Sequence, residues 1–192
     1  MESVGKLSMT TGSTQMEAME ALSGVINAYG KNIADAEEIS AQFFKTVDLG
    51  RVQLGQIANS IGQVVGPASL LGVRFEEVAS ALSLLTIRGI SPSMALTQLR
   101  QIMFALIKPS KEMKEQLRDF GVESGQALIQ TYGFAEAMGK LEEAAKDDAS
   151  ELGQLFKNIR ALVPSLIFAG KGMDEYRKIL DETKNSAQTY ND

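Results

Sequence analysis

Hydrophobic residues recur along most of the chain at the three- and four-residue spacing of amphipathic helices. Clear series of this kind begin at Phe75, Ala95 and Leu152, and each leaves a single apolar stripe along its helix. Alternation with a period of two, which is typical of strands, does not persist anywhere in the sequence. The pattern therefore predicts an all-α fold.

Signals for helix N-termini divide this pattern into short helices. Candidate N-cap residues stand at Thr14, Asp35, Ser91, Ser110 and Asp148. Thr14, Asp35 and Asp148 are each followed three residues later by Glu, which makes a capping box that satisfies two backbone N–H groups. Pro92 follows Ser91 at a first helical position, where the missing N–H of proline costs nothing. These positions are therefore expected to begin helices.

Helix C-termini carry a repeated signal, a glycine followed by a branched apolar residue. This pair occurs at Gly72-Val73, Gly89-Ile90 and Gly121-Val122, and Gly30, Gly133 and Gly170 are similar candidates. A left-handed glycine ends a helix, and the next residue then contacts the last turn. The signals predict helices near residues 14–29, 35–47, 52–65, 74–88, 92–107, 110–120, 134–147, 149–162 and 173–187.

Short connections make successive helices antiparallel neighbours, so we expect a compact multi-helix bundle of short helical hairpins with glycine-terminated turns. Residues 1–13 are expected to form a flexible N-terminal segment and residues 14–172 the helical core domain. Residues 173–192 are expected to form a C-terminal helix with a frayed polar tail.

The residue types that the sequence lacks exclude more classes of function than the residue types that it contains. The 192 residues include no Cys, His or Trp. The usual thiolate nucleophile, general base and zinc ligands are therefore absent from the sequence. The net charge of −5 disfavours specific binding of nucleic acid. We expect no enzymatic activity, no catalytic, cofactor-binding or metal-ligating residues, and no cofactor.

Charged clusters could still carry chemistry. Adjacent carboxylates occur at Glu37-Glu38, Glu76-Glu77, Glu142-Glu143 and Asp147-Asp148, and basic residues at Lys108, Lys111, Lys114 and Arg118. Neighbouring side chains on a helix point about 100° apart, so the acidic pairs are interpreted as caps and solvated faces. Acidic residues are interleaved with the basic ones, and Lys111 and Glu115 have the spacing of an ion pair, which favours a solvated face there too.

The stretch Val52–Val73 contains 22 residues without a charge, and glycines are spread along it. One interpretation is a largely buried helix whose glycines allow close contact with neighbouring helices, although Pro67 is expected to break it. Contact with a membrane is the alternative. The nine methionines, among them Met9, Met16 and Met19, are interpreted as core residues or as an adaptable interface.

An ordered series of short motifs resembles the core region of phage tail tape measure proteins. The motifs lie at Leu71–Leu82, Arg88–Arg100, Lys108–Glu112, Asp119–Val122 and Leu155–Leu162, after earlier ones at Thr11–Ser13 and Ala28–Gly30. The resemblance covers about residues 10–172 in the order and spacing of the family. It implies a structural protein of the virion tail, made in the host cytoplasm, that takes part in tail assembly and in genome delivery.

The resemblance also implies partners. They are further copies of the chain and tail tube, tail chaperone or baseplate proteins. Because tape measure proteins are usually much longer than 192 residues, the chain is expected to hold the compact core and not the length-measuring helix.

Two other functions stay open at this point. In one, Val52–Val73 and Leu162–Phe168 insert into the host envelope during DNA ejection. In the other, two carboxylates converge in a cleft and act as a glycosidase.

Overall fold

The computed structural model describes residues 2–31, 35–144 and 171–191. Every regular element in these ranges is a helix, as the hydrophobic pattern predicts. The helices are α1 (Glu2–Thr11), α2 (Gln15–Tyr29), α3 (Ala36–Gly50), α4 (Leu54–Leu71), α5 (Phe75–Ile87), α6 (Pro92–Ile107), α7 (Lys111–Asp119), α8 (Gly125–Ala144), α11 (Lys171–Lys184) and α12 (Ser186–Asn191). The predicted helix 149–162, the cap at Asp148 and the stop at Gly170 lie outside the described residues.

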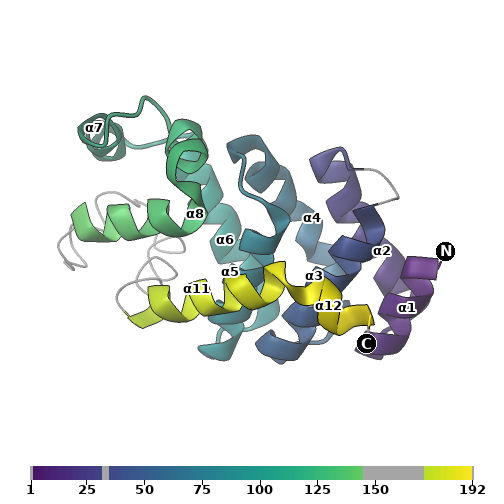
Figure 1. Cartoon of the computed structure of the whole chain (residues 1–192). Coiled ribbons are helices and arrows are strands. Elements are labelled where there is room, and N and C mark those ends of the chain that lie inside the picture. Colours follow the sequence, from purple (N-terminus) through teal and green to yellow (C-terminus); the bar gives the residue numbers. More distant parts are fainter. Residues whose placement is uncertain (1, 32–34, 145–170, 192) are drawn as a thin grey trace.

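Alternate helices pack side by side, so the hairpins stack into two layers. Helices α2, α4 and α6 follow one another in one layer, and α1, α3 and α5 in the other. Helices α11 and α12 then run back along α5 and α3 towards the N-terminal end (Figure 1). The array is therefore compact, and both termini lie at the same end of it (Figure 1).

Helix α5 lies at the centre of the array, and every residue from Glu77 to Leu85 is buried. Small side chains make this possible, because α3, α6 and α11 can approach α5 closely on several sides. The hydroxyl groups of Ser80 and Ser83 donate to carbonyl oxygens one turn earlier, at 2.6 and 3.1 Å. The buried hydroxyl groups of these two serines are thus satisfied within the helix.

Two of the predicted N-caps are confirmed by side-chain hydrogen bonds. The Thr14 hydroxyl accepts from the backbone N–H of Glu17 at 3.2 Å, and Glu17 accepts from that of Thr14 at 2.8 Å. The backbone N–H and the hydroxyl of Thr14 both donate to the Glu17 carboxylate and lower its pKa. Ser110 caps α7 by accepting from the N–H of Met113 at 3.1 Å. The prediction for Asp35 is wrong, since its helical backbone (φ −81°, ψ −5°) leaves its side chain without a capping bond.

The three stop signals in which a branched apolar residue follows the glycine are confirmed. Gly72 has φ +83°, and the N–H of Val73 donates to the carbonyl oxygen of Ala68 at 2.9 Å. An equivalent hydrogen bond closes the turn after α5, at Gly89, and the turn after α7, at Gly121. A left-handed residue followed by this return bond is the Schellman end of a helix.

The structure corrects three predictions about where helices lie. Residues 2–11 form α1, with Leu7 fully buried, and are not a flexible segment. Helix α4 is not broken at Pro67 and continues to Leu71. Gly66, the residue before the proline, has no Cβ to clash with the proline ring. The C-terminal end is not frayed, since α12 buries the Tyr190 ring against Phe44 (5.7 Å between centroids).

Candidate interaction surfaces

Helix α4, which forms most of the uncharged stretch Val52–Val73, is half buried and half exposed. One stripe of aliphatic side chains is buried, whereas Gln56, Asn59, Gln63 and Leu70 are exposed. The prediction that its glycines allow close packing is wrong for two of them. A Cβ added at Gly62 or Gly66 would meet nothing within 4 Å. Packing therefore leaves these two positions open, although Gln63 beside them contacts α6.

The exposed side of α4 continues onto α6. The guanidinium of Arg100 donates to the side-chain oxygen of Gln63 at 2.9 Å, which fixes the two helices in register. Because α4, α5 and α6 are joined by short turns, α4 and α6 run in the same direction.

Leu70 lies two turns beyond Gln63, and Phe104 and Ile107 lie one and two turns beyond Arg100. They are 70%, 46% and 41% exposed, respectively. We call Gln63, Leu70, Arg100, Phe104 and Ile107 the α4–α6 face. Its three apolar side chains are exposed, and its one charged group, the guanidinium of Arg100, is hydrogen bonded to Gln63.

A second apolar surface lies between the first two helices. Val4 on α1, Met19, Leu22 and Ile26 on α2, and Ala36 on α3 line a groove of about 330 Å³, which we call the α1–α2 groove. Met19 is 48% exposed. The prediction of core methionines is confirmed for Met103, Met113, Met138 and Met173, which are buried. Met9, Met16 and Met19 are exposed, and their role in an interface stays a prediction.

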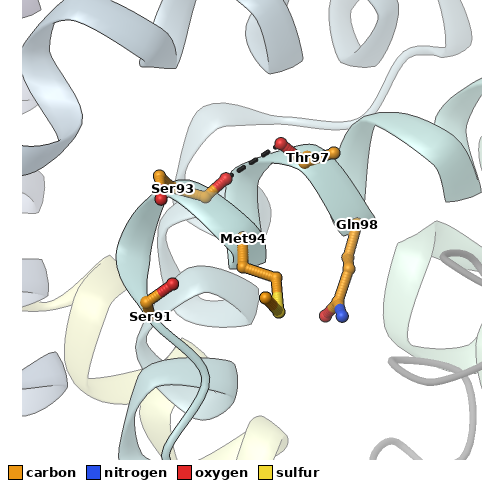
Figure 2. Close-up of a pocket in the computed structure, with 5 residues that line it drawn as sticks. All are labelled: Ser91, Ser93, Met94, Thr97 and Gln98. Atoms are coloured by element: carbon orange, nitrogen blue, oxygen red, sulfur yellow. Dashed lines mark hydrogen bonds between the residues drawn. The ribbon is translucent and has the colours of Figure 1, made fainter.

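A third pocket, of about 420 Å³, lies at the first turns of α6. Figure 2 shows Met94 and Gln98 projecting from the same side of the helix, while the Thr97 hydroxyl donates to the Ser93 carbonyl oxygen at 2.9 Å. The described lining residues carry no charge. The pocket offers neither an acid nor a base from those residues.

The four acidic pairs differ in how exposed they are and in the contacts that they make. Glu37 and Glu38 are exposed, and Glu38 lies 3.8 Å from the amine of Lys31. Glu143 is exposed, whereas Asp147 and Asp148 lie outside the described residues. No three His, Cys, Asp or Glu side chains among the described residues are placed to hold a metal ion.

Glu77 belongs to a helix cap, as predicted, but it does not lie on a solvated face, because its side chain is only 4% exposed. One carboxylate oxygen accepts from the backbone N–H of Arg74 at 3.0 Å, which completes a cap for α5. The other accepts from the backbone N–H of Phe134 at 3.0 Å. Phe134 follows Gly133, whose φ of +76° and ψ of 168° kink α8. A single buried carboxylate therefore joins α5 to the bend in α8.

Helix α11 also contacts Glu77. The Tyr176 hydroxyl donates to the main-chain oxygen of Glu77 at 3.0 Å, and its ring meets the Phe134 ring edge-on at 6.2 Å. Glu77, Phe134 and Tyr176 form a buried junction of three helices, which we call the Glu77 junction. Its role is structural, because all of its polar groups are used within the fold.

Tyrosine ionisation is expected to destabilise the protein at high pH. Burial, and then the nearby carboxylates of Glu77 and Glu76, raise the pKa of Tyr176 well above its usual value, and the same causes raise the pKa of Tyr29. Stability is therefore fully present below about pH 10, the pKa of unfolded tyrosine, and falls above it by about 1.4 kcal/mol per pH unit for each such tyrosine. Urea unfolding across this range measures the slope. Tyr176→Phe is expected to reduce it, and an unchanged slope in that variant would contradict the assignment.

The basic residues predicted to form a solvated face do so. Lys108, Lys111, Lys114 and Arg118 are exposed on or beside α7, and the amine of Lys111 lies 3.9 Å from the Glu115 carboxylate. No helix among the residues described here combines the length and the hydrophobicity needed to span a membrane. The other segment considered for insertion, Leu162–Phe168, lies outside those residues.

Comparisons with known proteins agree with the resemblance seen in the motifs. A tape measure protein of Pneumococcus phage Dp-1 is 24% identical over 144 residues, which cover 75% of this chain and 12% of that protein. A probable tape measure protein of Clostridium phage phiCD119 is 24% identical over 177 residues, which cover 88% of this chain and 19% of that protein. The chain thus spans less than a fifth of either relative. No solved structure matches it.

The family model of phage-related minor tail proteins matches residues 1–159, which is most of the chain. That family describes structural components of phage tails. The all-helical array, its exposed apolar surfaces and this match agree with one another. The chain belongs to the family of phage-related minor tail proteins.

Proposed function

We propose that the chain is a helical contact module of a tape measure protein, which is made in the host cytoplasm and takes part in tail assembly. In this proposal the chain acts by contacting other proteins and catalyses no reaction. The α4–α6 face supports this proposal most directly, because Leu70 is 70% exposed in a chain that has a well-filled core elsewhere. Exposed apolar clusters on a folded protein mark surfaces that other proteins cover.

The expected partners are tail tube, tail chaperone or baseplate proteins, or a further copy of the chain. The uncharged character of the exposed side of α4 favours such packing, because burying it against another helix removes no charge from water. Gly62 and Gly66 leave room for a partner helix to approach the backbone of α4.

A double charge substitution on the α4–α6 face tests the proposal. Leu70→Glu with Ile107→Glu is expected to weaken association with tail components by at least about tenfold, since central apolar contacts dominate such interfaces. Helix content should not change, because both side chains are exposed. Light scattering of mixtures with purified tail proteins measures association, and negative-stain imaging of tails from phage carrying the variant measures assembly.

Met9→Glu is the matched control, because Met9 is 84% exposed and lies outside the α4–α6 face. It should leave association unchanged. The proposal would be contradicted if the wild-type chain stayed monomeric and bound no tail or baseplate protein at any concentration.

A further inference from the structure

We propose that Gly133 is a hinge and that Glu77 is the catch that keeps it closed. When the bonds to Glu77 break, residues 134–144 of α8 and residues 171–178 of α11 move away from α5 together, while the stacked hairpins stay folded. This opening does not involve the α4–α6 face, so it goes beyond the proposed function and can be tested independently of it.

The hinge lies at the sharp bend of α8, which is visible in Figure 1. Gly133 has φ +76° and ψ 168°, a combination that is almost restricted to glycine. A Cβ added there would lie 3.5 Å from the nearest atom, in the Glu77 carboxylate, which is an ordinary contact. The need for glycine therefore comes from the backbone conformation and not from lack of space. Glycine also gives the chain the most freedom to rotate at this point.

The half of α8 before the hinge is anchored on the stacked hairpins. At its first residue, Gly125, an added Cβ would lie 2.8 Å from the carbonyl carbon of Leu106 on α6. The side chain of Gln130 lies beside Gly72 at the end of α4, 3.7 Å from where a Cβ would stand. This half is therefore expected to stay in place when the hinge rotates.

The half of α8 after the hinge is paired with α11 instead. The rings of Phe134 and Tyr176 meet edge-on at 6.2 Å. The guanidinium of Arg177 donates to the Glu136 carboxylate at 2.7 Å. These contacts join residues 134–144 to the beginning of α11, so the two segments are expected to move as one unit.

The far end of α11 is anchored separately on α3. The amine of Lys45 lies 3.6 Å from the Glu182 carboxylate, and the Tyr190 ring of α12 packs on Phe44. Neither contact involves α8 or Glu77. The opening is therefore expected to end near residue 178.

Glu77 holds both members of the unit on α5. Its carboxylate accepts from the Phe134 N–H at 3.0 Å, and its main-chain oxygen accepts from the Tyr176 hydroxyl at 3.0 Å. Both bonds are buried, whereas the ion pair between Arg88 and Glu175 that also joins α5 to α11 is exposed. Exposed ion pairs contribute little to stability. The two bonds to Glu77 are therefore the main polar attachment of the unit.

Alkylation of an introduced cysteine measures such a minor open form. The sequence contains no Cys, so each introduced thiol is the only one in its variant. Ala137→Cys reports on the second half of α8, and Ala21→Cys reports on α2; both alanines are fully buried. When alkylation is slower than reclosing, its rate follows the population of the open form.

We expect Ala137→Cys to be alkylated at least about tenfold faster than Ala21→Cys, because Ala21 is reached only when the array unfolds. Equal rates would overturn the proposal. Met173→Cys reports on α11, and adding Glu77→Ala should accelerate its alkylation by the same factor as that of Ala137→Cys. Acceleration of only one of the two would show that α8 and α11 do not open together.

Two further substitutions show which contacts the opening breaks. Glu77→Ala removes the catch and is expected to accelerate the alkylation of Ala137→Cys by at least about tenfold. Gly125→Ala overpacks the anchored half of α8, which is the same in the closed and open forms. It should accelerate the alkylation of Ala21→Cys and leave that of Ala137→Cys unchanged. Equal acceleration of both reporters by Gly125→Ala would contradict the separate opening.

Gly133→Ala tests the hinge itself. Alanine is strained in the closed conformation, so the alkylation of Ala137→Cys should become about tenfold faster. Gly139→Ala is the matched control, because its Cβ would stand at a helical position with its nearest neighbour, Met173, 4.0 Å away. It should leave the rate unchanged. Circular dichroism checks that both variants are folded, and a folded Gly133→Ala chain that is alkylated no faster than the control would refute the hinge.

Discussion

Replacing Glu77 with alanine is expected to lower the free energy of unfolding by about 2–4 kcal/mol. The substitution removes the acceptor for the buried N–H of Phe134, and a buried donor without a partner costs about 1–3 kcal/mol. It also removes the bond to the Arg74 N–H, which caps α5 and contributes about 1 kcal/mol. Both bonds belong to one carboxylate, so they are lost together.

Urea unfolding followed by the helical circular dichroism signal measures this effect. Glu77→Gln keeps one acceptor oxygen, so its free energy of unfolding should lie between those of wild type and Glu77→Ala. Glu136→Ala is the matched control, since it removes an exposed carboxylate paired with Arg177 and should cost less than about 1 kcal/mol. Equal losses for Glu77→Ala and Glu136→Ala would show that the Glu77 junction does not hold the helices together.

Gly125→Ala is expected to destabilise the fold by about 1–3 kcal/mol, the usual cost of overpacking. A Cβ at this position would lie 2.8 Å from the carbonyl carbon of Leu106 and 2.9 Å from its Cα. These are backbone atoms of α6, so relief requires the start of α8 to move away from α6.

Gly62→Ala is the control, and it should change stability in the opposite direction. Its Cβ would meet nothing within 4 Å, and its position inside α4 favours alanine by up to about 1 kcal/mol. Thermal unfolding of the two variants gives the comparison. A stabilised Gly125→Ala would contradict the close approach of α6 and α8.

The sequence predicts most of the helices because their signals are local, but it does not predict the first half of α8, residues 125–132. Caps such as Thr14 and stops such as Gly72 involve bonds within five residues, and their residue types reveal them. Helices α1 and α12 were missed because each is short and carries few apolar residues. Leu7 is buried where α1 packs on α2 and α3, and Tyr190 is buried where α12 packs on α3, and no local pattern encodes these contacts.

The Glu77 junction and the α4–α6 face depend on contacts between residues that are far apart in the sequence. Local sequence patterns therefore do not predict them. The sequence reveals Glu77 as a helix-start residue, but its bond to Phe134 spans 57 positions. The α4–α6 face likewise depends on the register set by Gln63 and Arg100, which are 37 positions apart. Methionine spacing predicted core or interface, and only packing separates buried Met103 from exposed Met19.

The central place of α5 has a consequence for how the molecule opens. Its amides between Glu77 and Leu85 are shielded on every side, so solvent deuterium can reach them only when the stacked hairpins come apart. Helix α7, with two buried side chains in nine residues, can fray alone and exchange early. The slowest amides of the whole chain should therefore lie in α5, the helix between the layer that carries the α4–α6 face and the returning helix α11.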